Sequence, residues 1–265
     1  MEHFVDKLLS REYNLTEEIL AIEKLFLKKD DYGSSIYDAV SRNFLNWRLR
    51  NNYIEFDNFF TSTGLEYIVE MCHKNCEISI EEFIYYCEYI LNIFLLSNVN
   101  QRIYVRFIRD NITNLLEKLN YVSLFDEGKW HIVEKNVLVS EGADIVQDNY
   151  DLGESIYSFN YRENKGNINK KADILCRLYK YIEGITAQAK QYGYSNLLED
   201  IKDLMNKLDI RHIATLKQAT VIEGMDKSEY EQWIDELFKM ALSLIVLTDY
   251  TSKKKDIKEL KGMLG

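Results

Sequence analysis

The 265-residue chain contains no proline. Proline normally marks loops and the first turns of helices, because its ring fixes φ and it lacks a backbone N–H. Its absence, together with abundant Leu, Ile, Glu and Lys, favours long helices joined by polar turns. We therefore expect a mainly α fold, a multi-helix assembly.

The composition is typical of a folded globular protein, with 46% hydrophobic and 13% aromatic residues. The length suffices for one large domain or two small ones. The formal net charge of −10 repels polyanions, which disfavours a protein that coats nucleic acid over a large surface. A local basic face remains compatible with this charge.

The first residues, MEHFVDKLLSREYN, have neither the basic region nor the apolar stretch of a secretory signal. The most apolar run, residues 90–96, is far shorter than the roughly 20 residues that span a bilayer. We therefore expect a cytoplasmic protein that does not engage a membrane.

Apolar residues recur at helical spacing through most of the chain, and capping residues precede many of these segments. Ser79 and Glu82, for example, form a capping box. In the long helix that Asp226 opens, we expect Trp233 and Leu237 on the core face. The other expected helices cover residues 15–28, 34–50, 65–74, 79–97, 101–119, 138–147, 152–161, 168–191, 195–208 and 253–264, with an aromatic-rich connector at 53–63.

The helical pattern is interrupted once, at residues 121–136. Two β-prone runs, YVSLF and WHIV, flank the turn DEGK, which predicts a β-hairpin. A lone hairpin is marginal in water and must pack on neighbouring helices. The sequence thus predicts an N-terminal helical lobe over 1–120, the hairpin over 121–136 and a C-terminal helical bundle over 137–265.

The sequence does not predict a metal site or a cofactor. Cys72 and Cys76 lie one helical turn apart beside His73, but a structural zinc site needs four ligands and the chain offers no second cysteine pair. The glycines stand apart, without a GxGxxG or GxxxxGK motif, so neither a Rossmann enzyme nor a P-loop NTPase is indicated.

The most distinctive charged feature is the set Arg102, Arg106 and Arg109, which share one helix face. Their guanidinium groups could bind phosphate, including that of nucleic acid. They could equally pair with the carboxylates of this acidic chain. Because this helix leads into the hairpin, a winged helix-turn-helix built on the helices at 65–74, 79–97 and 101–119 is a further alternative.

Three segments of the C-terminal half carry a resemblance to a known family. The segments YSFNYRENKGNINKKADIL at 157–175, LLEDIKDLMNKLDIRH at 197–212 and EYEQWIDELFKMALSLIVLTDY at 229–250 resemble helical abortive-infection proteins of bacterial antiphage defence, loosely of the HEPN type. In that superfamily an arginine and a later histidine form a metal-independent ribonuclease dyad. The resemblance implies Arg211 and His212 as catalytic candidates, although here the two residues are adjacent rather than separated.

These observations favour a bacterial, intracellular, phage-defence-like protein that binds a protein or nucleotide partner, or a second copy of itself, rather than performing chemistry. A HEPN-like ribonuclease toxin acting through Arg211 and His212 is the enzymatic alternative. A winged-helix DNA-binding regulator is the other alternative. Nucleic acid would be bound through the face of Arg102, Arg106 and Arg109.

Overall fold

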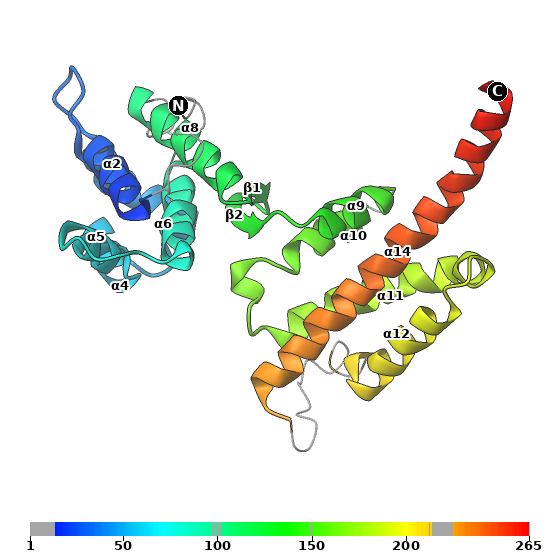
Figure 1. The fold of residues 1–265 in the computed structure, drawn as a ribbon. Coiled ribbons are helices and arrows are strands. Elements are labelled where there is room, and N and C mark those ends of the chain that lie inside the picture. The colour runs from blue at the N-terminus through cyan, green and yellow to red at the C-terminus, as the bar shows by residue number, and fades with distance from the viewer. Residues whose placement is uncertain are drawn as a thin grey trace. The chain divides into compact units, whose positions relative to one another are not determined.

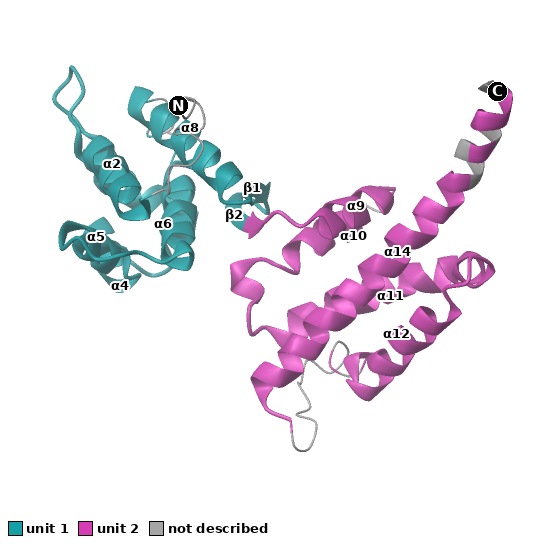
Figure 2. Cartoon of the chain, viewed as in Figure 1, with its two compact units in different colours: residues 1–132 teal, residues 133–265 magenta. Residues whose placement is uncertain are grey.

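A computed structural model describes residues 14–96, 99, 102–148, 150–211, 213 and 225–264. The described chain is mainly helical and contains one two-stranded hairpin, which confirms the predicted fold class (Figure 1). It divides into two compact units, residues 1–132 and residues 133–265 (Figure 2). Each unit buries its own cluster of hydrophobic side chains.

The first unit is a set of short helices around an aromatic core. Phe44, Trp47, Phe56 and Phe59 are buried there with ring centroids 5.1–6.4 Å apart. Ser35 and Ser79 cap helices through capping boxes, as the spacing of Ser79 and Glu82 predicts. The elements are α2 (Leu15–Leu27), α3 (Ile36–Asn43), η1 (Phe44–Asn46), η2 (Arg48–Arg50), α4 (Phe56–Ser62), α5 (Leu65–His73), α6 (Ile80–Ile93) and α8 (Ile103–Lys118).

Two expectations for this unit are wrong. The helix expected over 34–50 is broken, because the backbone of Trp47 is extended and separates η1 from η2. This position lets the Trp47 indole donate a hydrogen bond to the backbone carbonyl of Asn92 at 3.0 Å. The connector expected at 53–63 instead contains α4, which buries Phe56 and Phe59.

The hairpin consists of β1 (Tyr121–Asp126) and β2 (Lys129–Glu134). Glu127 and Gly128 both have positive φ, 47° and 81°, as the tight turns of two-residue hairpins require. The outer edge of β2 is covered by helix α6. The side-chain amide of Asn92 pairs with both the N–H and the C=O of Trp130 at 2.8 Å, and Glu88 accepts the N–H of Ile132 at 2.8 Å.

The second unit is built around two long helices, α11 and α14. Gly142 in α9 lies against Leu242 so closely that an added Cβ would stand 2.7 Å from its side chain, so glycine permits the close approach of α9 and α14. The elements are α9 (Val137–Ile145), α10 (Tyr150–Ser158), η3 (Arg162–Asn164), α11 (Ile168–Gln191), α12 (Ser195–Lys207) and α14 (Lys227–Leu264).

Two expectations about α14 are also wrong. The helix does not end before residue 253 but continues unbroken to Leu264, since Thr251 and Ser252 are weak helix formers rather than helix breakers. Leu237 is buried as expected, but Trp233 is 43% exposed, and its neighbour Ile234 is buried instead. Adjacent helical residues point about 100° apart, so Trp233 lies beside the core face and not on it.

None of the helices in the described part of the chain is both long and apolar enough to cross a bilayer.

Candidate functional site

A buried lysine joins the two long helices of the second unit. The Lys171 ammonium is hydrogen-bonded to Glu231 and to Asp235, each at 2.7 Å, and lies 5.1 Å from the centroid of the Phe159 ring. Phe159 in turn stacks on Phe238 with ring centroids 3.8 Å apart. Because the Lys171 side chain is only 7% exposed, its charge needs these two carboxylates to remain buried.

Glu231 also fixes the loop that precedes α11. One of its carboxylate oxygens accepts the backbone N–H of Gly166 at 2.7 Å, and Gly166 has a φ of 76°, which favours glycine. Burial acts to raise the pKa of Glu231, but the hydrogen bonds from Lys171 and Gly166 outweigh it, and the pKa is lowered. Glu231 is therefore a carboxylate at neutral pH, and it shares the charge of Lys171 with Asp235.

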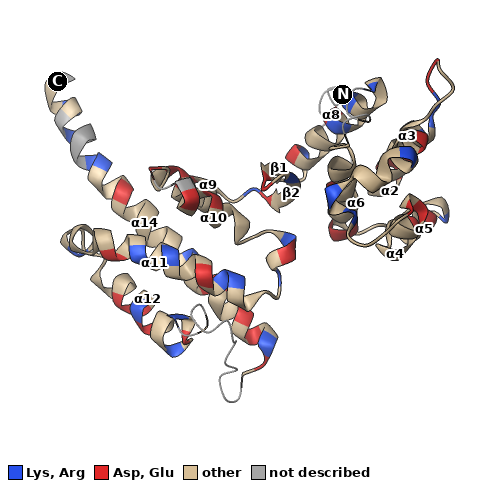
Figure 3. Cartoon of the chain, turned by 180° about the vertical axis from the view of Figure 1, so that it is seen from behind, with Lys and Arg blue, Asp and Glu red and all other residues tan. Residues whose placement is uncertain are grey.

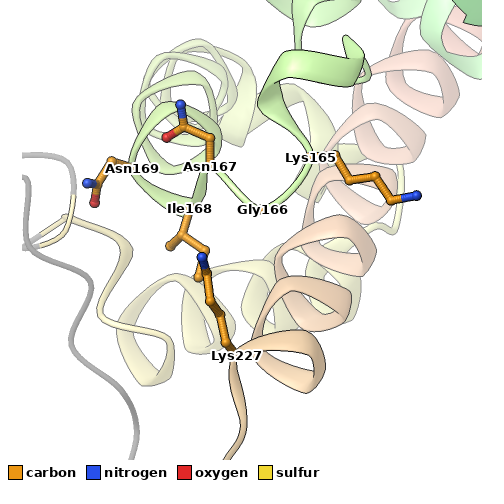
Figure 4. Close-up of a pocket in the computed structure, with 6 residues that line it drawn as sticks. All are labelled: Lys165, Gly166, Asn167, Ile168, Asn169 and Lys227. Carbon is orange, nitrogen blue, oxygen red and sulfur yellow. The ribbon is translucent and has the colours of Figure 1, made fainter. Parts of the chain in front are cut away.

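A pocket of about 300 Å³ lies next to this cluster, at the N-terminus of α11. Its lining comes from the turn before α11, the first turn of that helix and the start of α14 (Figure 4). The Asn167 side chain caps α11 by accepting the N–H of Lys170 at 3.1 Å. The lining residues are Lys165, Gly166, Asn167, Ile168, Asn169 and Lys227.

Both charged side chains of this lining are lysines. Figure 4 shows Lys227 extending toward Ile168, whereas Lys165 extends away from it. Both lysines are exposed. The pocket lies at the positive end of the dipole of a 24-residue helix, where anions are favoured.

A second hollow of about 770 Å³ lies in the first unit, beside the starts of α2 and α6. Its charged lining residues are Glu17 and Glu77, and the rest are polar or apolar. This lining does not suit an anion. The pocket at α11 is therefore the better candidate for a phosphate-bearing ligand.

The three arginines proposed for anion binding differ in their surroundings. Arg102 forms an ion pair with Asp30 at 3.1 Å and donates to the backbone carbonyls of Ser34 and Ser35, each at 2.9 Å, so it holds the start of α8 against the loop before α3. Arg106 is 84% exposed and lies 3.8 Å from Asp110. Arg109 is partly buried.

Arg211, the first catalytic candidate, lies at the surface. Its guanidinium forms an ion pair with Glu183 at 3.2 Å and stands 5.1 Å from the centroid of the Tyr179 ring. His212, the second candidate, lies outside the described residues.

The cysteine and histidine pair considered for metal binding has other surroundings. Burial, helped by nearby Glu23, raises the pKa of the Cys72 thiol to about 11, so this thiol is neutral. His73 instead contacts Glu23 at 2.8 Å. Across the residues that the structure describes, no three metal-ligating side chains come together.

Sequence reasoning missed the Lys171 cluster, although a signal for it exists. Lys171 stands three residues after Ile168 and four before Leu175, which places a charge on the apolar face of its helix. Glu231 and Asp235 lie one turn apart and flank the buried Ile234 in sequence, so they too stand beside the apolar face of their helix. Opposite charges on two apolar faces predict a buried ion pair.

No protein-family model, curated protein or solved structure matches this chain.

Proposed function

We propose that the chain is a bacterial antiphage-defence protein that acts in the cytoplasm by binding a nucleotide, without chemistry of its own. The observation that carries the binding part is the pocket at the start of α11, lined by Lys165, Gly166 and Lys227. Lysine ammonium groups bind phosphate as point charges, and the first turn of a helix presents backbone N–H groups that lack intrahelical partners.

The positive charge that favours an anion at this position comes from the two lysines of the pocket lining. Glu231 lies close to Gly166 and shares Lys171 with Asp235, so that cluster keeps one net negative charge. Asp226 accepts the N–H of Glu229 at 2.8 Å and so belongs to the cap of α14. Lys165 and Lys227 must therefore outweigh these carboxylates when an anion binds.

The defence part of the proposal rests on the resemblance in sequence. Residues 157–175, one of the three segments that resemble abortive-infection proteins, also contain most of the pocket lining and Lys171. One of the three segments that carry the resemblance therefore supplies all of the pocket lining except Lys227.

Calorimetric titration with ATP, and separately with inorganic phosphate, tests the binding. We expect ATP to bind, and Lys227→Glu to weaken its binding by at least about tenfold, the effect of losing one charged hydrogen bond of about 1.4 kcal/mol or more. Lys258→Glu, a matched change at an exposed lysine on the same helix, should leave the affinity unchanged. Absence of binding by both ligands, or equal losses in the two variants, would overturn the assignment.

Phage plaque counts on bacteria that express the chain test the defence role. Protection that is lost with Lys227→Glu and kept with Lys258→Glu would link defence to the pocket. Metal-independent RNA degradation that His212→Ala alone abolishes would instead favour the ribonuclease alternative.

A further inference from the structure

The C-terminal part of α14 extends beyond the helices that pack against the rest of it (Figure 1). Thr248 is the final buried residue of α14 among those whose exposure is described. Three residues further on, the Thr251 hydroxyl still contacts the Tyr194 hydroxyl at 2.7 Å. Helices in water owe most of their stability to the packing of an apolar face, so a helical extension of this kind is expected to have a partner.

The described side chains of this extension include large exposed apolar groups. Tyr250, Leu260 and Met263 are 60%, 55% and 83% exposed. Val246, Tyr250, Lys253 and Leu260 follow one another at steps of four, three and seven residues, which is the spacing of the core positions of a coiled coil. In sequence, Ile257 and Leu264 continue the same register.

The charges that flank this stripe favour a second copy of the chain as the partner. Asp249 directly precedes the core position of Tyr250, and Lys254 directly follows that of Lys253. Within one chain the Asp249 carboxylate contacts the Lys253 ammonium at 2.7 Å, so pairing with Lys254 of a second copy would replace or share this contact. In a parallel pair of identical helices, these flanking positions meet across the interface when they are five residues apart, as Asp249 and Lys254 are. In sequence, Asp256 and Lys261 repeat the pair seven residues later.

An antiparallel pair would bring like charges together, since equivalent flanking positions then face each other. The lysines along this end of α14 contrast with the net charge of −10 of the whole chain (Figure 3). In the parallel arrangement, the acidic flanking positions of one helix therefore face the basic flanking positions of the other.

We propose that residues 246–264 of α14 form a parallel two-stranded coiled coil with a second copy of this chain. The paired segment is about 28 Å long at 1.5 Å per residue. Lys253 is the one polar residue among the core positions, and a lysine there lowers stability while fixing register. The dimer is therefore reversible, and its strength depends on residue 253.

Sedimentation velocity over a range of protein concentrations tests the interface. We expect a concentration-dependent dimer that Leu260→Asp weakens at least tenfold and that Lys253→Leu tightens at least tenfold. Lys258→Asp, at an exposed position off the stripe, should have little effect. The far-UV circular dichroism spectrum of each variant checks that it is folded.

A charge exchange tests the orientation. Lys254→Glu should weaken the dimer by placing two acidic groups side by side, and adding Asp249→Lys should restore it. A tighter dimer with Lys254→Glu would overturn the parallel arrangement. A chain that stays monomeric even with Lys253→Leu, or that cosediments as a monomer with vesicles of anionic lipid, would overturn the whole proposal.

Discussion

At the scale of single residues, the ion cluster around Lys171 links the fold of the second unit to its pocket. Lys171 and Glu231 are separated by sixty residues along the chain, yet their charged atoms are 2.7 Å apart. The same carboxylate holds Gly166, which lines the pocket. A change at Glu231 should therefore affect both the stability of the unit and the shape of the pocket.

The lowered pKa of Glu231 predicts how stability depends on pH. A carboxyl group with a lowered pKa stabilises the folded state above its unfolded pKa, here the ordinary value of 4.5, and this contribution is lost as pH falls through the folded pKa. Glu231→Gln should lower the free energy of unfolding at pH 7 by about 1.5–3 kcal/mol, the scale of a charged hydrogen bond. It should also reduce the further loss of stability below pH 4.5.

Urea denaturation at pH 7, 4 and 3 provides the measurement. Glu229→Gln, at an exposed glutamate in the first turn of the same helix, is the control. Its free energy of unfolding should fall with pH by the same amount as that of the unchanged chain. If the free energy of unfolding falls equally on acidification in Glu231→Gln and in the unchanged chain, the Lys171 cluster does not set the pH dependence of stability.

At the scale of elements, α14 has a buried face and an exposed face, and consecutive residues can lie on different ones. Phe238→Ala should cost about 3–5 kcal/mol, because the side chain is buried and stacks on Phe159. Trp233→Ala should cost less than about 1 kcal/mol, since Trp233 is partly exposed. Denaturation followed by far-UV circular dichroism measures both. Similar costs for the two variants would contradict this assignment of the faces.

The sequence predicts the positions of helices and strands better than it predicts which helix faces are buried or which distant segments are in contact. The capping box at Ser79 and Glu82 and the turn glycine at 128 are local signals, so α6 and the hairpin lie near their expected positions. The apolar pattern of α14 favours Trp233 as a core residue because its side chain is large and apolar, but the adjacent Ile234, about 100° around the helix, is the buried one. The pocket depends on contacts between distant segments, which periodicity does not encode.

At the scale of the whole molecule, each compact unit has its own hydrophobic core. We expect Phe83→Ala to accelerate hydrogen exchange of the core helices within residues 14–132 and to leave those within 133–264 unchanged. Phe83 is fully buried, and its loss should destabilise its own unit by about 3–5 kcal/mol.

Exchange measured by mass spectrometry on peptides of both units tests this expectation. Phe107→Ala is the matched control, because Phe107 is 53% exposed and should leave both units unchanged. Faster exchange in both units after Phe83→Ala would show that they unfold as one.

The pairing of α6 with β2 has a consequence for misassembly. An uncovered strand offers a row of N–H and C=O groups on which a foreign strand can grow. Asn92 already occupies both groups of Trp130, and Glu88 occupies the N–H of Ile132. A helix thus supplies the hydrogen bonds that a third strand would supply, and this side of the hairpin is closed to templated fibril growth as long as α6 stays in place.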